Sequence, residues 1–79
     1  MTKVESADRA LQMLQAFAYR GQGLTASALA VKLGVHRSNA TRLAATLVER
    51  GFLERASGGE TFRLGPEVAR LGVIALAAR

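Results

Sequence analysis

Hydrogen-bonding side chains are concentrated in one short segment of this chain, residues 37–42. The segment contains Arg37, Ser38, Asn39, Thr41 and Arg42 and no acidic residue. Arginine can bind guanine through two hydrogen bonds, asparagine can bind adenine, and threonine can contact the methyl group of thymine. These residue types therefore predict contacts with the base edges and phosphates of DNA. The alternative is a solvated helix surface, but such a surface usually mixes in acidic residues.

Two arginines further along the chain, Arg55 and Arg63, flank a Ser-Gly-Gly turn at residues 57–59. The backbone amides of such a turn can approach phosphates closely. An arginine beside it can enter a narrow minor groove. Glu54 and Glu60 lie nearby, so a solvated hairpin loop is the alternative to a DNA contact.

Two hydroxyl residues, Thr25 and Ser27, stand at the predicted start of a helix. The free amide groups of a helix N-terminus suit a phosphate, so both residues are candidate DNA contacts. Capping the helix is the first role expected of Thr25. His36 is the only histidine, and a lone histidine makes neither a metal site nor a catalytic triad. We expect it in the N-cap region of the next helix, with a phosphate contact as the alternative.

The sequence shows no other group of residues suited to catalysis or metal binding. Paired carboxylates, a nucleophile with a base and a phosphate-binding glycine loop are all missing. The glycines have turn or cap explanations. The chain contains no cysteine, which excludes disulfides and thiolate metal sites. We therefore expect no enzyme activity, no catalytic residue, no cofactor and no metal.

Composition and charge favour a polyanionic partner. The 79 residues carry a formal net charge of +5, from 11 basic and 6 acidic residues. Such a balance is typical of small nucleic-acid-binding domains, although it also fits a merely soluble basic surface. The hydrophobic share of 49% is sufficient for one packed core. No apolar run reaches the ~18 residues needed to span a bilayer, so we expect no membrane partner. The absence of cysteine fits a reducing cytoplasm, which is the expected location.

Three helices are predicted before the hairpin. The spacing of apolar residues indicates the first at about 7–20, with Ser6 as its N-cap and Gly21 after its end. The second is expected at about 26–33 and the third at about 37–50. The apolar stripe expected to bury the first helix comprises Ala7, Ala10, Leu11, Leu14, Phe17 and Ala18.

The second and third helices meet at Gly34, where glycine permits the left-handed backbone of a short turn. Ala30 is small, as a close helix crossing requires, and the side chain of Val35 is expected to fill the space inside the turn. The positions that would bury the two helices are Leu29, Leu33, Ala40 and Leu43. Such a turn sets the helices at roughly 90–120°, so that the second can lie in a major groove. Any one position fits a generic α-hairpin, but their joint occurrence predicts a helix-turn-helix.

Two short strands are predicted after the third helix, at residues 52–56 and 61–64, with Phe62 and Leu64 on one side of the second strand. A hairpin at this place makes the helix-turn-helix winged. The expected fold class is therefore mainly α with a small β-hairpin, a winged helix-turn-helix followed by the start of a linker helix. The expected boundaries are 4–65 for the DNA-binding domain, about 26–45 for the helix-turn-helix, and about 52–64 for the wing.

A last helix is predicted to start at Pro66, because proline is favoured in the first turn of a helix. Residues 71–78 read LGVIALAA, and a helix that is apolar on nearly every side is normally buried on more than one face. No stop signal precedes Arg79. We therefore expect residues 66–79 to begin a linker helix in a truncated chain, or to form a helix that pairs with a partner.

Three segments of the chain resemble one known family. They read SADRALQMLQAF from residue 6, LTASALAVKLGVHRSNATRLAATLVERGFLER from residue 24, and FRLGPEVARLG from residue 62. Together they resemble the N-terminal domain of IclR-type (isocitrate lyase regulator) transcription factors over residues 4–78. His36 stands where family members often have proline, and Asn39 where threonine is common. Both differences lie at the start of the predicted DNA-reading helix, so the resemblance does not predict the operator sequence.

The resemblance implies a bacterial repressor or activator that binds a double-stranded DNA operator as a homodimer or a dimer of dimers. It also implies a C-terminal domain, absent here, that binds a small-molecule effector, and a contribution of the first and last helices to dimerisation. We therefore expect sequence-specific DNA binding, with residues 37–50 in the major groove and the wing on the adjacent backbone or minor groove. The alternatives are a protein–protein or dimerisation module without specific DNA binding, and a winged helix that binds RNA.

Overall fold

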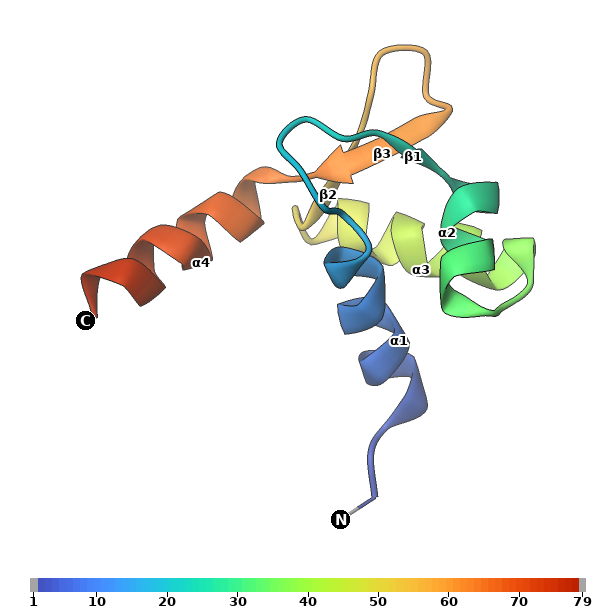
Figure 1. The fold of residues 1–79 in the computed structure, drawn as a ribbon, viewed down its shortest axis with the longest axis horizontal. Coiled ribbons are helices and arrows are strands. Elements are labelled where there is room, and N and C mark those ends of the chain that lie inside the picture. The colour runs from blue at the N-terminus through green and yellow to red at the C-terminus, as the bar shows by residue number, and fades with distance from the viewer. Residues whose placement is uncertain (1, 79) are drawn as a thin grey trace.

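Four helices and three short strands make up residues 2–78, the part of the chain that the computed structural model describes (Figure 1). In chain order they are α1 (Glu5–Gln15), β1 (Leu24–Thr25), α2 (Ala26–Leu33), α3 (Arg37–Glu49), β2 (Leu53–Arg55), β3 (Thr61–Leu64) and α4 (Pro66–Ala77). This order confirms the predicted winged helix-turn-helix. Arg79, the last residue of the predicted linker helix, lies outside the described residues.

The turn between α2 and α3 has the local geometry that the sequence predicts. The Thr25 hydroxyl oxygen accepts a hydrogen bond from the amide of Ala28 at 3.1 Å, so Thr25 caps α2. Gly34 ends the helix with a φ of +69°, a left-handed conformation that costs residues with a Cβ roughly 1–2 kcal/mol. His36 is the N-cap residue of α3, but its side chain makes no capping hydrogen bond.

The core lies where α1, α2, α3 and the sheet meet, and its most extensive packing joins α2 to α3. The two helices bury Leu29, Ala30, Ala40, Ala44 and Leu47. Because three of these side chains are alanines, the two backbones can approach each other closely. Leu29, Ala30 and Ala40 are buried as predicted, whereas the predicted Leu33 and Leu43 are only partly buried against the core. The other buried hydrophobic side chains are Met13, Leu24, Leu53 and Phe62.

The hairpin belongs to a three-stranded antiparallel sheet with the order β1–β3–β2. Phe62 in the central strand is buried and pairs with Leu24 in β1 and Arg55 in β2. Sequence reasoning missed β1, because a strand of two residues is too short to show an alternating pattern. The second predicted strand is confirmed, whereas β2 is shorter than the predicted 52–56. Leu64, expected on the side of Phe62, is 38% exposed.

The predicted bounds of α1, residues 7–20, are wrong at both ends. Ser6, expected as the N-cap, lies inside the helix, which ends at Gln15. Beyond that end, the side-chain oxygen of Gln22 accepts a hydrogen bond from the amide of Ala18 at 2.7 Å. A loop amide is thereby satisfied without a helical partner, so a loop replaces the last predicted turn.

The face that α1 buries also differs from the predicted stripe. Met13 is fully buried at 0% exposure, whereas Leu11 is 60% exposed. Ala7 and Ala18 are exposed as well. The stripe residues that do pack against the core are Ala10, Leu14 and Phe17. The buried face is therefore rotated toward Met13, whose long and flexible side chain suits an irregular space between elements.

The last helix, α4, extends away from the other helices (Figure 1). None of its residues is buried. Its large apolar side chains are 43–71% exposed at Leu71, Val73, Ile74 and Leu76. An apolar surface of this kind is typical of an interaction site. Within residues 2–78, no helix combines the length and the apolar character needed to cross a membrane.

The start of α4 is tied to the turn that follows α3. The amide of Gly65 donates to the carbonyl of Phe52 at 2.8 Å, and the amide of Glu67 donates to the carbonyl of Gly51 at 2.9 Å. A Cβ atom at Gly65 would collide with the Gly51 carbonyl oxygen, so the approach requires glycine. The direction in which α4 leaves the domain is therefore fixed by backbone contacts.

The observed packing of α1 predicts unequal effects of two similar truncations. We expect Met13→Ala to lower the free energy of unfolding by about 2–5 kcal/mol, because it leaves a cavity in the core. Leu11→Ala acts on an exposed side chain and should change that free energy by about 0.5 kcal/mol or less. Urea unfolding followed by far-UV circular dichroism measures both.

Equal losses of unfolding free energy in the two variants would contradict the packing of Met13 and would indicate that Leu11 is part of the core. Met13→Leu serves as a milder variant if Met13→Ala does not fold. It keeps most of the side-chain volume and should cost less than about 1.5 kcal/mol.

Candidate nucleic-acid interface

The nine residues predicted to bind DNA are all exposed. They are Thr25, Ser27, Arg37, Ser38, Asn39, Thr41, Arg42, Arg55 and Arg63. Five of the nine lie on α3, whose opposite side is buried through Ala40, Ala44 and Leu47. The exposed face of α3 is therefore the face that helical periodicity predicts.

One open groove, called here the wing groove, lies between the start of α2, the first turns of α3 and the β2–β3 hairpin. The predicted residues that line it are Thr25, Ser27, Arg37, Thr41 and Arg55. The fold thus brings together hydroxyls from one helix start and arginines from two other elements. Glu60 is the acidic residue among those that line the groove. Hydroxyl and guanidinium donors in this arrangement suit a phosphate group.

Arg55 is positioned in the wing groove by an aromatic ring. Its guanidinium carbon lies 4.9 Å from the ring centre of Phe62, its cross-strand partner. A cation over an aromatic face is attracted by about 0.5–1 kcal/mol at exposed sites. The ring is 2% exposed and hence fixed by the core. Phe62 therefore restrains Arg55 and leaves its N–H groups able to bind an anion.

Arg63 is not brought together with the other candidate residues. Its Nε atom donates to Oε1 of Glu54 at 2.8 Å, and the two residues are cross-strand partners. Successive residues of a strand point to opposite faces, so Arg63 faces away from the side of Phe62 and Arg55. It lines a separate groove with Tyr19 and Arg20. The alternation of side chains along the predicted second strand already placed Arg63 on the side opposite to Phe62, the partner of Arg55.

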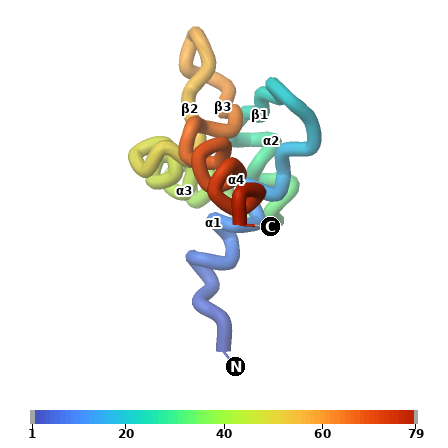
Figure 2. The backbone as a smooth tube through the Cα atoms, turned by 90° about the vertical axis from the view of Figure 1, so that its left-hand side faces the viewer, coloured from blue at the N-terminus to red at the C-terminus, as the bar shows by residue number. Residues whose placement is uncertain are grey.

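A second groove, called here the α1 groove, lies on the other flank of α3. It is lined by Ser6 and Arg9 of α1 and by Asn39, Arg42, Leu43 and Thr46 of α3. Figure 2 shows α3 between the β2–β3 loop and the N-terminal end of α1. Sequence reasoning missed Ser6 and Arg9 as possible contacts. No local pattern indicates them, because only the packing of α1 brings them to α3.

The two arginines of α3 differ in their electrostatic surroundings from several other arginines. Arg37 and Arg42 form no ion pair with any of residues 2–78. Acidic partners lie within 4.0 Å of Arg9, Arg63 and Arg70. The positive charge on the outward face of α3 is therefore not offset by an adjacent carboxylate, which favours an external anion.

In α4, by contrast, the positive charge of Arg70 is neutralised by the carboxylate of Glu67. Arg70 donates to the carboxylate of Glu67 from Nε at 2.7 Å and from Nη2 at 2.9 Å. The hydrogen bonds to Arg70 and its positive charge lower the pKa of Glu67, while the same hydrogen bonds and the negative charge of Glu67 raise the pKa of Arg70. Both groups stay charged at neutral pH, and their charges offset each other. This arginine therefore contributes little to the attraction of DNA.

The threonine hydroxyls of α3 donate inward, to the helix backbone. Thr41 Oγ1 donates to the carbonyl of Arg37 at 2.9 Å, and Thr46 Oγ1 donates to the carbonyl of Arg42 at 3.1 Å. Their donor capacity is thereby used, while lone pairs and methyl groups stay available. Thr41 therefore suits contact with a thymine methyl or with a donor group on a base. Among the described residues, no group of three or more His, Cys, Asp or Glu could hold a metal ion.

Comparison with known families identifies the helix-turn-helix. The family model of the IclR helix-turn-helix domain matches residues 6–57, which run from α1 to the loop of the hairpin. No curated protein matches the chain significantly.

Solved structures share the fold, among them an IclR family regulator. The IclR family transcriptional regulator from Brucella abortus has a TM-score of 0.86 and 28% identity over 95% of this chain and 28% of that chain. Pseudomonas aeruginosa HmgR has a TM-score of 0.85 and 29% identity, over 95% of this chain and 32% of that chain. The Agobacterium tumefaciens repressor BlcR has a TM-score of 0.75 and 33% identity, over 89% of this chain and 28% of that chain.

The chain spans less than a third of the length of these three regulators. The family model and the solved structures describe transcriptional regulators and not enzymes, in agreement with the absence of a catalytic arrangement in the sequence. The matched region contains α2, α3 and the turn between them, which form the helix-turn-helix. The chain therefore belongs to the IclR family, of which it represents the helix-turn-helix DNA-binding domain.

Proposed function

We propose that this domain binds operator DNA sequence-specifically, with α3 in the major groove and the β2–β3 hairpin on the adjacent backbone or minor groove. The observation that carries the proposal is the outward face of α3. It presents Arg37 and Arg42 without ion pairs, together with the amide and hydroxyl groups of Ser38, Asn39 and Thr41. The N-terminal half of a recognition helix is the part that contacts base edges.

The wing groove separates two types of proposed contact. Ser38, Asn39 and Arg42 lie on α3 outside the wing groove and are assigned to base edges. The wing groove collects donors from three elements and is assigned to a phosphate. Arg55 lines this groove and Arg63 does not, so Arg55 is the stronger candidate for the contact of the wing with DNA.

The whole protein is proposed to be a bacterial regulator that acts in the cytoplasm as a homodimer or a dimer of dimers. The exposed apolar residues of α4 support contact with a second copy, since a dimer pairs two recognition helices with two half-sites. In this proposal, residues 4–65 form the DNA-binding domain and residues from 66 onward begin the linker. A small-molecule effector would bind in a further domain, as the length of the IclR relatives suggests.

A dimerisation module without DNA binding is the competing function, and the apolar surface of α4 is the feature that favours it. The family match favours DNA binding instead. A fluorescence anisotropy titration of residues 1–79 with a random-sequence duplex at two salt concentrations separates the two functions. DNA binding releases counterions and weakens as salt rises. Binding that is absent, or that does not respond to salt, would contradict the proposed function.

We expect Arg42→Ala to weaken binding to a selected high-affinity duplex by about 1–3 kcal/mol, because it removes a base contact. The duplex is obtained by selection from a random library, and the same variant is titrated against unselected DNA. A larger loss on the selected duplex identifies a base contact. A uniform loss identifies a phosphate contact, and an unchanged affinity removes Arg42 from the interface.

The hairpin offers a matched pair of charge deletions. We expect Arg55→Gln to reduce the slope of log affinity against log salt by about 1, because it removes one phosphate contact. Arg63→Gln removes the same charge from the other face of the hairpin and should leave the slope nearly unchanged. Equal reductions in the two variants would show that the wing contributes only a general positive charge. Thermal unfolding of both variants provides the control for intact folding.

A further inference from the structure

The α1 groove brings two arginines from different helices to one surface. Arg9 comes from α1 and Arg42 from α3, and the groove is completed by Ser6, Asn39, Leu43 and Thr46. None of these lining residues is acidic. Two positive charges lining one groove favour the binding of an anion there. Guanidinium and hydroxyl donors together suit a phosphate or carboxylate.

The position of the groove indicates which anion it would bind. Asn39 and Arg42 line the groove and also belong to the face of α3 assigned to base edges. A helix in the major groove, which is about 12 Å wide, has one DNA backbone on each flank. The wing groove lies on the flank of α3 toward the β2–β3 hairpin, and the α1 groove lies on the flank toward α1. The group that reaches the α1 groove is therefore a phosphodiester of the same duplex.

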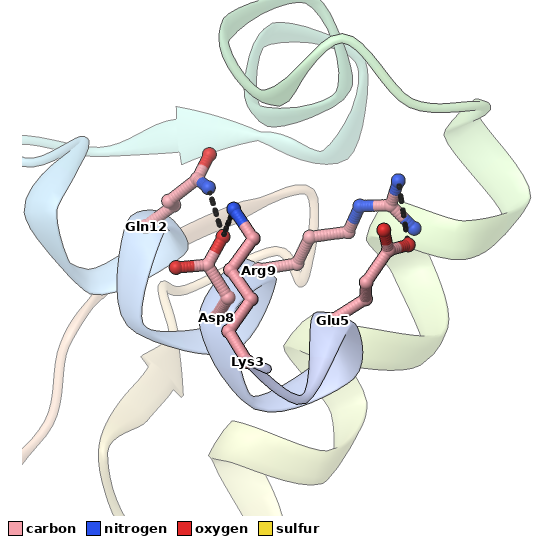
Figure 3. Close-up of polar contacts among 5 residues, drawn as sticks. All are labelled: Lys3, Glu5, Asp8, Arg9 and Gln12. Carbon is pink, nitrogen blue, oxygen red and sulfur yellow. Dashed lines mark hydrogen bonds and ion pairs between the residues drawn. The ribbon is translucent and has the colours of Figure 1, made fainter. Parts of the chain in front are cut away.

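Arg9 also has an acidic neighbour. Its Nη2 atom lies 3.7 Å from Oε2 of Glu5, and the two side chains are 44% and 72% exposed. Figure 3 shows this pair apart from the cluster around Asp8, in which Lys3 and Gln12 contact the same carboxylate oxygen. An exposed pair at this separation is weak and exchanges readily for a stronger ligand. The carboxylate of Glu5 would also repel an approaching phosphate.

We propose that Arg9 binds a DNA phosphate on the flank of α3 opposite the wing, and that Glu5 opposes this contact by pairing with Arg9 in the free protein. The proposal rests on the proposed function, because it requires α3 to lie in the major groove. α1 is then part of the DNA interface as well as of the core. Arg9 and Glu5, which lie outside the helix-turn-helix, then contribute to the affinity for DNA.

The test compares two deletions of one positive charge from the same region. Arg9→Gln is expected to weaken binding of residues 1–79 to the selected duplex about eightfold at 0.1 M salt and to reduce the salt slope by about 0.9, the value for one phosphate contact. Lys3→Gln removes a charge that is paired with Asp8 and should leave both quantities nearly unchanged. Far-UV circular dichroism and thermal unfolding establish that both variants fold.

Two results would overturn the contact of Arg9. One is an unchanged affinity and slope in Arg9→Gln. The other is an equal loss in Lys3→Gln, which would reduce the effect to net charge. Arg42→Ala in the same titration separates this proposal from the proposed function. If Arg42→Ala weakens binding and Arg9→Gln does not, only the contact of Arg9 fails, whereas unchanged binding in both refutes the placement of α3.

The role of Glu5 has its own variant. Glu5→Gln is expected to raise the affinity severalfold at low salt, because it releases Arg9 and removes a repulsive charge. In the Arg9→Gln background the same substitution should have a smaller effect, since the competition for Arg9 is gone. An affinity that stays the same or falls in Glu5→Gln would overturn the opposing role. An effect of equal size in both backgrounds would assign it to net charge alone.

Discussion

The close crossing of α2 and α3 is the constraint on which the rest of this domain depends. Ala30, Ala40 and Ala44 are buried in these helices, and their small side chains let the two backbones approach. Gly34 makes the short turn possible through its left-handed conformation. Because one side of α3 is committed to this contact, its polar residues must face outward. The packing that stabilises the domain and the surface proposed to contact DNA are thus two sides of one helix.

The flanks of α3 give this surface its shape. The hairpin brings Arg55 to one flank, held over the ring of Phe62, and α1 brings Arg9 to the other. Phe62 pairs with β1 and β2 and is buried in the core, so the position of Arg55 follows from the packing of the sheet. Arg63 follows Phe62 in β3, faces the opposite side of the sheet and forms an ion pair with Glu54. Strand alternation thus decides which arginine of the wing faces the wing groove, whereas the number of arginines does not.

Local signals in the sequence predicted the helix-turn-helix, and tertiary contacts account for what they missed. The cap at Thr25 and the turn at Gly34 depend on neighbouring residues, so α2 was predicted with its observed bounds. The end of α1 depends on the contact of Gln22 with Ala18, and its buried face on the space that Met13 fills. The outward face of α3 followed from periodicity. The place of Arg9 beside it did not, because α1 and α3 meet only in the folded chain.

The link between α3 and α4 explains how a partner of α4 could act on DNA binding. The carbonyls of Gly51 and Phe52, in the turn after α3, accept the amides at the start of α4, and Gly65 fits there because it has no Cβ. The turn after α3 and the start of α4 are therefore held together by backbone hydrogen bonds, although the β2–β3 hairpin lies between them in the chain. In a dimer formed through α4, this connection would set the separation of the two α3 helices. Half-sites lie one helical turn of DNA or a multiple of it apart, so a small rotation at α4 would decide whether both α3 helices can enter the major groove.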